Sequence, residues 1–355
     1  MNNELVKHLN RISQLKLTFH RISKLHYESE SMKIWARWII THRGLFTSSQ
    51  KSILLPDDEV YDTQLIQELI DKGCPHNHAK YLHKWLWEQT ISINKNYQMT
   101  AEVEYGGIRG IEPVMLTPCY NNRYCLKCGN INTYIKISAY DKLAMSLKNN
   151  SYLSNINDIN DINGYIWLTN VLYTMLDGKG LQWAVPQQLM LFLKQQLNCT
   201  TELFASPINH YYDKYYSLFE MDRIYGSKGN FFTAKDNDFK EGCFQINPPF
   251  IDSLFTKTSL KILNLLKIAN NNRKKLTFVY IMPIWKDFPT YTMVTDSHFC
   301  VKSITLSADK HSYYEYSTHK YIRARFNTAV IFLSTDDKIC NKIYDDTIRR
   351  LFNYK

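Results

Sequence analysis

The stretch EGCFQINPPFIDSLF, residues 241–255, decides the fold. Its apolar run 242–246 is typical of a short buried strand. The next residues, Pro248 and Pro249, have no backbone N–H, so neither a helix nor a central strand continues through them. An amphipathic segment follows at 259–272, and KLTFVYIMPIW (275–285) is typical of another buried strand. A strand, a break, a helix and a second strand together predict an α/β unit.

The flanking sequence extends this pattern. A helix is predicted at 186–198, opened by Pro186, followed by a short strand and turn within 201–209 and a helix at 210–219. Two more strands are predicted at 301–307 and 327–334. Strands that alternate with helices predict a mostly parallel sheet with helices on both faces. Ligands of such sheets bind beyond the carboxyl ends of the strands, so we expect FASPIN (204–209) and NPPF (247–250) to share one pocket.

The first part of the chain has a different pattern. Apolar residues recur at helical spacing in 5–19, 31–45 and 77–93, and their tryptophans are interpreted as core residues. The segments 102–116 and 132–140 look more like strands. KNNSYLSNINDINDING, residues 148–164, is rich in Asn, Asp and Ser and is predicted to be a linker. We therefore predict a mainly helical domain at 1–164 and an α/β domain at 165–355.

Composition narrows the class of protein. The chain has 355 residues, 45% of them hydrophobic, as expected of a globular protein. It has no apolar run long enough to cross a membrane, and its polar first residues lead us to expect no secretory signal. Eight cysteines in a chain of this size do not indicate a disulfide framework. We expect an intracellular protein, cytoplasmic or nuclear. The net charge of +10 favours a polyanionic partner such as nucleic acid, although solubility alone would also explain it.

NPPF fits one kind of chemistry well. The exocyclic amine of adenine is a poor nucleophile because its lone pair is delocalised into the ring. Two acceptors aimed at its hydrogens, the Asn247 side-chain oxygen and the Pro248 carbonyl, would favour the pyramidal and more nucleophilic nitrogen. Phe250 would stack on the base, which is worth about 1–3 kcal/mol. The electrophile would be the methyl group of S-adenosylmethionine. The alternative for these four residues is a plain proline turn.

The motifs around NPPF resemble those of the phosphorylated CTD interacting factor 1 family. Those enzymes are cap-specific adenosine N6-methyltransferases. The similarity spans about residues 182–335. The matching residues, in chain order, are Phe204–Asn209, Asp222, Tyr225–Ser227, Asn247–Phe250, Pro283, Trp285, His311, Tyr313 and His319.

The resemblance implies a Rossmann-like S-adenosylmethionine-dependent methyltransferase domain, preceded by a mainly helical accessory domain. The implied substrate is capped mRNA, methylated on its first transcribed, 2′-O-methylated adenosine. Catalysis would fall to Asn247, Pro248, Pro249 and Phe250. The cofactor contacts would be Ser206, Pro207, Asn209, Asp222, Gly226 and Ser227. The substrate contacts would be Trp285, His311, Tyr313 and His319, with Arg323 and Arg325 expected at phosphates.

Three departures from the family pattern limit what the resemblance implies. We find no WW pattern around Trp35 and Trp38, so we expect no WW-mediated binding to the polymerase tail. Ile284 stands where the family has an acidic residue, and Tyr316 stands where we expect glycine. Two other functions stay open: N6-adenine methylation of internal RNA or DNA, and RNA binding by a pseudoenzyme without turnover.

A metal site is the weaker interpretation of the cysteines. Cys119, Cys125 and Cys128 include one Cys-x-x-Cys pair, and Cys74 lies near three histidines. A structural zinc ion would need a second half-site that the sequence does not clearly supply. We therefore favour free thiols and predict no metal.

Overall fold

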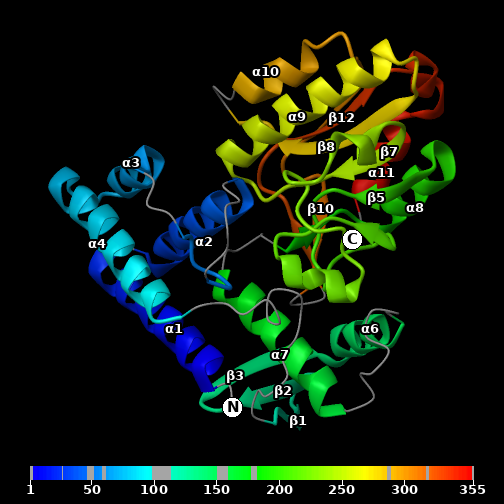
Figure 1. The fold of residues 1–355 in the computed structure, drawn as a ribbon. Coiled ribbons are helices and arrows are strands. Elements are labelled where there is room, and N and C mark those ends of the chain that lie inside the picture. Colours follow the sequence, from blue (N-terminus) through cyan, green and yellow to red (C-terminus); the bar gives the residue numbers. More distant parts are fainter. Residues whose placement is uncertain are drawn as a thin grey trace. The chain divides into compact units, whose positions relative to one another are not determined.

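The computed structural model describes residues 3–25, 27–45, 52–57, 61–97, 113–149, 159–176, 182–285, 289–316 and 320–353. Its packing divides the chain into two compact units: residues 1–179 with 220–225, and residues 180–219 with 226–355. Figure 1 labels the elements of both.

The first unit begins with four helices and continues with a small sheet and two further helices. Its elements are α1 (Asn3–Ser23), α2 (Glu28–Leu45), α3 (Thr63–Asp71), α4 (His76–Lys95), β1 (Met115–Cys119), β2 (Arg123–Cys128), β3 (Ile131–Lys136), α6 (Ile137–Lys148), α7 (Ile159–Leu176) and the 3-10 helix η2 (Glu220–Tyr225). The three strands form one antiparallel sheet in the order β1-β2-β3.

Buried aromatic side chains hold the first unit together. Trp35 and Trp38 of α2 and Trp87 of α4 are fully buried, and the rings of Trp38 and Trp87 meet edge to face with centroids 5.4 Å apart. The prediction that the tryptophans of these helices are core residues is confirmed for these three, whereas Trp85 of α4 is only half-buried. Arg37 lies beside them, and its charge is balanced by Asp62 at 3.1 Å and Glu68 at 2.8 Å.

Part of the predicted linker is helical. Residues 150–158 lie outside the described ranges, but α7 begins at Ile159 and runs through the predicted domain boundary at 164. The linker prediction is wrong from Ile159 onward. Ile162, Tyr165, Ile166 and Trp167 are buried, so burial of an apolar helix outweighed the local preference of Asn and Asp for turns.

The second unit is built around a larger sheet. Its elements are β4 (Trp183–Ala184), α8 (Gln187–Leu197), β5 (Cys199–Glu202), β6 (Lys214–Tyr215), η3 (Asp236–Phe239), β7 (Gly242–Ile246), α9 (Asp252–Asn271), β8 (Leu276–Pro283), α10 (Pro289–Thr295), β9 (Cys300–Leu306), β10 (Ser312–Glu315), β11 (Lys320–Arg323), β12 (Thr328–Ser334), η4 (Asp337–Lys342) and α11 (Asp345–Phe352).

The six-stranded sheet has the order β6-β5-β7-β8-β12-β9. β6, β5, β7 and β8 are parallel, whereas β12 is antiparallel to both of its neighbours. One face packs on α9 and α10 and the other on α8 and α11, as Figure 1 shows. The predicted α/β class, with helices on both faces of a mostly parallel sheet, is confirmed.

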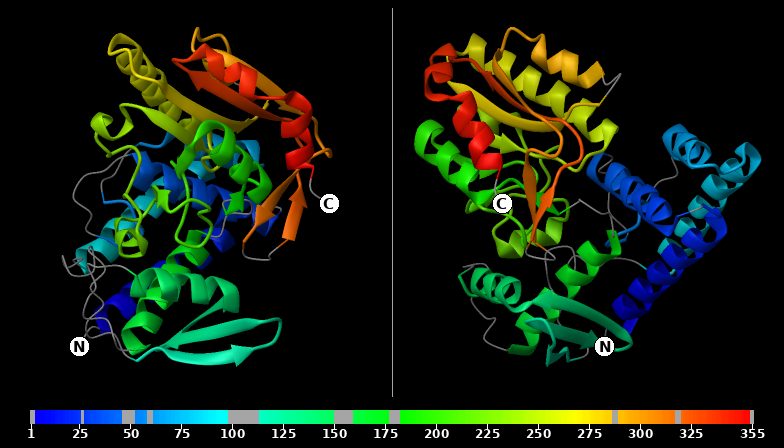
Figure 2. Two further views of the ribbon diagram at one scale, coloured as in Figure 1. Left: turned by 90° about the vertical axis from the view of Figure 1, so that its right-hand side faces the viewer. Right: turned by 180° about the vertical axis from the view of Figure 1, so that it is seen from behind.

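A second, smaller sheet has the order β11-β10-β4 and is antiparallel. In both views of Figure 2 the hairpin of β10 and β11, coloured orange, extends away from the large sheet. It carries several of the predicted substrate contacts.

The helix predicted at 210–219 is wrong. Lys214–Tyr215 forms the edge strand β6 instead, and Tyr216 N–H donates to the Glu202 carbonyl at 2.8 Å. Glu202 also accepts from the N–H groups of Tyr211 and Tyr212 through its side chain, at 2.6 and 2.8 Å. These long-range bonds hold the segment extended, which local spacing does not reveal.

The structure bears on two further properties. No helix in the described ranges is both long enough and apolar enough to cross a membrane. Those ranges also contain no group of three or more His, Cys, Asp or Glu residues placed to hold a metal ion, and all eight cysteines are free thiols.

Candidate active site

The candidate active site begins where β7 ends. β7 runs through the centre of the sheet between β5 and β8, and its last residue, Ile246, is fully buried. Asn247 follows directly, and the two prolines stop the ladder as the sequence predicts. Ile251 N–H donates to the Pro249 carbonyl at 2.7 Å, and α9 starts one residue later. NPPF is therefore a tight connection at the carboxyl end of a buried strand.

FASPIN lies at the same edge. It follows β5, the parallel neighbour of β7, and Leu203 N–H donates to the Gln245 carbonyl at 2.9 Å. The chain goes from β5 to β6 on one side, whereas β7 lies on the other side of β5. The carboxyl ends of β5 and β7 thus flank the point where the strand order reverses, which is where ligands of open α/β sheets bind.

The side-chain amide of Asn247 has a defined orientation. Its Nδ2 lies 3.0 Å from the carbonyl oxygen of Trp183. A carbonyl oxygen only accepts, so the amide nitrogen must face it and Oδ1 must point elsewhere. Oδ1 is buried and has no hydrogen-bond partner among the described residues. A buried acceptor without a donor costs about 1–3 kcal/mol, so Oδ1 favours the approach of a donor group.

Pro248 adds a second acceptor next to the first. It is buried and has no N–H, and no hydrogen bond to its carbonyl oxygen is found within the described ranges. Two acceptors from adjacent residues, without a competing donor from Pro248 or Pro249, suit a ligand group with two N–H bonds.

Trp183 positions Asn247 and was not singled out in the sequence. Its backbone carbonyl holds the Asn247 amide, and its indole N–H donates to Glu315 at 3.1 Å. Its ring stacks on Tyr313, with centroids 5.7 Å apart and planes 18° apart. A tryptophan in a two-residue strand has no sequence signal of this role, because its partners on β7 and β10 are distant in the chain.

Phe250 is half-buried in a ring of aromatic side chains. Tyr313, Phe326 and Trp285 meet it edge to face, with centroids 5.8, 5.5 and 6.4 Å away. Contacts of this geometry fix the plane of the ring. The predicted substrate residues Trp285 and Tyr313 are therefore brought to Phe250.

Tyr313 and His311 share a buried hydrogen-bond network. Both rings are almost completely inaccessible. His311 Nδ1 donates to the Ser307 carbonyl at 2.9 Å, and Nε2 lies 2.8 Å from the Thr328 hydroxyl. Burial lowers the pKa of His311, so the ring is neutral and Nε2 accepts from Thr328. The Tyr313 hydroxyl, 3.1 Å from Thr328 Oγ1, must then be the donor of that pair. The structure therefore places His311 in the core, behind the aromatic ring, and its predicted substrate contact finds no support there.

Two of the predicted cofactor segments are joined through the residues after β6. Ser206 N–H and Asn209 Oδ1 are 2.7 Å apart, and their turn is linked to Tyr216 by the Ala205 N–H bond of 2.9 Å. Next to Tyr216, Ser217 shares a 2.6 Å hydroxyl bond with Ser227. Ser206–Asn209 and Ser227 thus lie on either side of 215–217.

The backbone conformation at position 226 favours glycine. Its φ of +95° is one that side-chain-bearing residues rarely adopt, and an added Cβ would meet open space. Space is therefore available directly beside Ser227. Pro207 lies in the turn between Ser206 and Asn209. These cofactor contacts stay predictions.

Asp222 belongs to a different compact unit from the other predicted cofactor contacts. It belongs to η2, which groups with the first unit, and is fully buried. Its Oδ2 accepts from the Tyr173 hydroxyl of α7 at 2.7 Å. Its predicted cofactor contact stays a prediction, and the Tyr173 hydrogen bond joins η2 to α7.

The remaining predicted substrate residues differ in exposure. Arg323 and Arg325 are exposed at the end of the β10–β11 hairpin, on either side of buried Ala324. His319 lies outside the described residues. Ile284, where the family pattern is acidic, packs half-buried against the hydrophobic core, so no carboxylate stands at that position. Burial raises the pKa of Tyr316 to about 12.

The region that contains FASPIN and NPPF is similar to known proteins. Residues 142–316 match the family described as "Phosphorylated CTD interacting factor 1 WW domain". The human protein named mRNA (2′-O-methyladenosine-N(6)-)-methyltransferase is 30% identical over 171 residues, which are 46% of this chain and 23% of that protein. The mouse protein of the same name is 30% identical over 168 residues, 45% of this chain and 23% of its own length.

Residues 142–316 are thus similar to the phosphorylated CTD interacting factor 1 family. The resemblance given on FASPIN, NPPF and their neighbours is confirmed. The family description names a WW domain, so the expectation that this chain lacks WW-mediated binding has no support from the comparison. The matched segment contains α7, α8 and the parallel strands β5, β7 and β8. The chain spans about a quarter of the length of these relatives.

Proposed function

We propose that this chain transfers a methyl group from S-adenosylmethionine to N6 of an adenosine in RNA, and that the preferred adenosine is the first transcribed one beside the mRNA cap. The observation that carries the proposal is the buried, unpartnered Oδ1 of Asn247. The names of the human and mouse relatives support the choice of substrate.

The amine clamp follows from the geometry at the end of β7. Asn247 Oδ1 would accept one N6 hydrogen and the Pro248 carbonyl the other. Both oxygens stabilise the positive charge that develops on nitrogen as it bonds to carbon. Trp183 holds the Asn247 amide at 3.0 Å, so the acceptor is oriented before the substrate arrives. Phe250, held by three edge contacts, would stack on the base.

The cofactor would lie at the reversal point of the strand order, in a Rossmann-like domain. The crevice flanked by β5 and β7 is the position that such folds use for ligands. Ser206, Asn209 and Ser227 would contribute polar groups, and Gly226 would leave room for close approach. S-adenosylmethionine, when bound, supplies an electrophilic methyl group.

The enzymatic proposal is tested with labelled methyl transfer to capped and uncapped RNA that begins with A or G. We expect label on capped RNA that begins with A, recovered as N6-methyladenosine by mass spectrometry of the digested product. Equal labelling of uncapped RNA would refute the cap preference and leave methyl transfer standing. Label on internal adenosines or on DNA instead would assign the alternative substrates.

Asn247→Ala separates catalysis from folding. We expect the rate of methyl transfer to fall by a factor of about 10²–10³, the effect of removing one preorganised hydrogen-bonding group at a reacting centre. Asn264→Ala, on the exposed side of α9, is the matched control and should keep full activity. Circular dichroism checks that both variants fold. Full activity of folded Asn247→Ala would refute the amine clamp.

Calorimetry with S-adenosylmethionine distinguishes an enzyme from a pseudoenzyme. We expect the wild-type chain to bind the cofactor in the absence of RNA. RNA binding without cofactor binding and without label on any substrate would assign the pseudoenzyme instead.

A further inference from the structure

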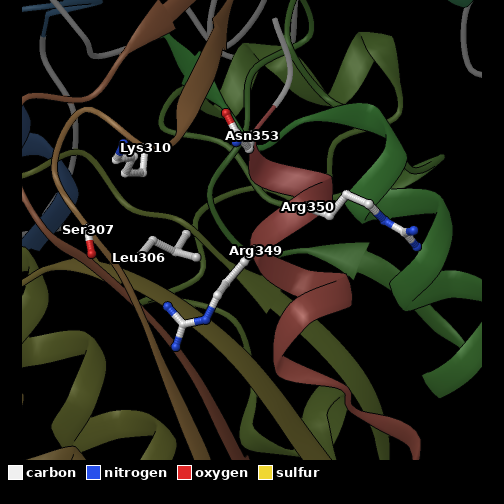
Figure 3. Close-up of a pocket in the computed structure, with 6 residues that line it drawn as sticks. All are labelled: Leu306, Ser307, Lys310, Arg349, Arg350 and Asn353. Carbon is white, nitrogen blue, oxygen red and sulfur yellow. The ribbon is translucent and has the colours of Figure 1, made fainter.

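A cationic pocket lies at the carboxyl end of β9, the outermost strand of the large sheet. It has a volume of about 340 Å³ and lies between the end of β9 and α11. Figure 3 shows the six residues that line it: Leu306, Ser307, Lys310, Arg349, Arg350 and Asn353. Lys310, Arg349 and Arg350 are basic and Ser307 and Asn353 are polar, so all but Leu306 offer groups that can donate hydrogen bonds to an anion.

Arg349 and Lys310 provide the charge inside the pocket. In Figure 3 the guanidinium group of Arg349 extends toward Leu306 and Ser307, whereas that of Arg350 points away. Arg349 donates to the Thr305 carbonyl and lies 3.9 Å from Asp345, so part of its charge is balanced. Lys310 is exposed, and its ammonium group has no partner among the described residues. It is therefore the cation that a ligand would engage at least cost.

The basic surface continues from the pocket onto the hairpin. The Ala324 N–H donates to the His311 carbonyl at 3.0 Å, and the Asp309 N–H donates to the Ala324 carbonyl at 2.8 Å. These two bonds place Ala324 beside Lys310, the residue between Asp309 and His311. The exposed Arg323 and Arg325 flank Ala324. Cations from the β9–β10 turn, the end of β11 and α11 thus gather at one end of the sheet.

The pocket and NPPF share one edge of the sheet. β9 runs in the same direction as β7 because both strands adjoining β12 are antiparallel to it, so both carboxyl ends lie at this edge. Three strand spacings separate them, about 14 Å. The network from Tyr313 through Thr328 and His311 to Ser307 connects the ring around Phe250 to the pocket wall.

We propose that this pocket binds a backbone phosphate of the RNA, a few nucleotides from the adenosine held at NPPF. The inference rests on the proposed function for its ligand. A phosphodiester carries the negative charge and the acceptor oxygens that Lys310, Arg349 and the polar rim complement. The pocket would then set the direction in which the RNA leaves the active site.

The test measures RNA binding without methyl transfer. Fluorescence anisotropy gives the affinity of the full chain for two labelled capped RNAs over a range of salt concentrations. One RNA ends one nucleotide after the target adenosine, and the other is long enough to extend along the sheet edge. For Lys310→Glu we expect weaker binding of the long RNA, with a slope of log K against log salt smaller by about 0.7, the value for one lost phosphate contact on a single strand. Binding of the short RNA should not change.

Lys267→Glu is the matched control. Lys267 is exposed on α9, outside the pocket, and the substitution changes the net charge equally. An equal loss of affinity in both variants, or an unchanged salt slope in Lys310→Glu, would overturn the proposal. Weaker binding of pyrophosphate by Lys310→Glu with both RNAs unaffected would assign the pocket to a small phosphate compound and overturn the RNA assignment. Because binding is read without catalysis, a chain without methyltransferase activity would still give a result here.

Discussion

The hydroxyl of Thr328 joins the two halves of the network behind Phe250, and its removal should be costly. In the neutral-histidine arrangement, Tyr313 donates to Thr328 Oγ1 and Thr328 donates to His311 Nε2, at 3.1 and 2.8 Å. All three residues are almost fully buried. Thr328→Val keeps the shape of the side chain and leaves two polar groups unpaired. At about 2 kcal/mol for each, the free energy of unfolding should fall by about 4 kcal/mol.

Tyr313→Phe is the variant with which the stability loss of Thr328→Val is compared. It removes one donor and leaves the bond from Thr328 to His311 intact, so it should cost only about 1 kcal/mol. The double variant should cost less than the sum of the two, because Thr328→Val no longer strands a tyrosine hydroxyl. Thr328→Ser retains the hydroxyl group and should restore most of the lost stability.

Urea unfolding followed by circular dichroism and tryptophan fluorescence measures these costs. For a unit of this size, Thr328→Val should lower the midpoint of thermal unfolding by about 8–16 °C. Methyl transfer should fall in parallel, because Tyr313 supports both Trp183 and Phe250. A Thr328→Val variant no less stable than Tyr313→Phe would refute the assigned proton positions.

Two further predictions concern single basic residues, His8 and Lys261. Burial lowers the pKa of His8 to about 4, so the folded state binds fewer protons than the unfolded state between pH 4 and 6.5; the free energy of unfolding should be constant above pH 6.5 and fall by about 3 kcal/mol as the pH approaches 4. Urea titrations at several pH values should show this fall diminished in His8→Gln, and an unchanged pH profile would contradict it. Lys261 Nζ donates to three backbone carbonyls at 2.8–3.3 Å and lies 4.8 Å from the Phe231 ring centroid. Lys261→Met should therefore lower the free energy of unfolding by about 2 kcal/mol. Lys267→Met, on the exposed side of α9, should change it by no more than about 0.5 kcal/mol. Equal unfolding midpoints for the two methionine variants would count against this role of Lys261.

Sequence predicted the parts of the second unit whose signals are local. The run 242–246 and the double proline mark the end of β7, and the apolar run in 275–285 marks β8. Alternation of strands and helices was enough for the α/β class and for placing FASPIN and NPPF at strand ends. The amide of Asn247 was expected to present an acceptor, and its unpartnered Oδ1 is consistent with that expectation.

Features that depend on long-range partners could not be predicted. The segment 210–219 is extended because β5 and the Glu202 carboxylate bind its backbone, more than eight residues earlier in the chain. His311 lies in the core because Ser307 and Thr328 satisfy both of its nitrogens. The role of Trp183 depends on a backbone carbonyl, which carries no residue-type signal. The Asn-rich end of the predicted linker forms the start of α7 because its apolar side chains are buried in the core of the first unit.

The position of β12 has a consequence for how the chain is synthesised. It is the last strand of the sheet in sequence, yet it pairs with β8 on one side and β9 on the other. Until it emerges from the ribosome, β8 and β9 each have an unpaired edge, and the edge of the wholly buried strand β8 is hydrophobic. Unpaired strand edges promote association with other chains. Thr328, which begins β12, arrives at the same moment as the hydroxyl that Tyr313 and His311 require. Completion of the sheet and closure of the hydrogen bonds behind Phe250 therefore depend on the same strand.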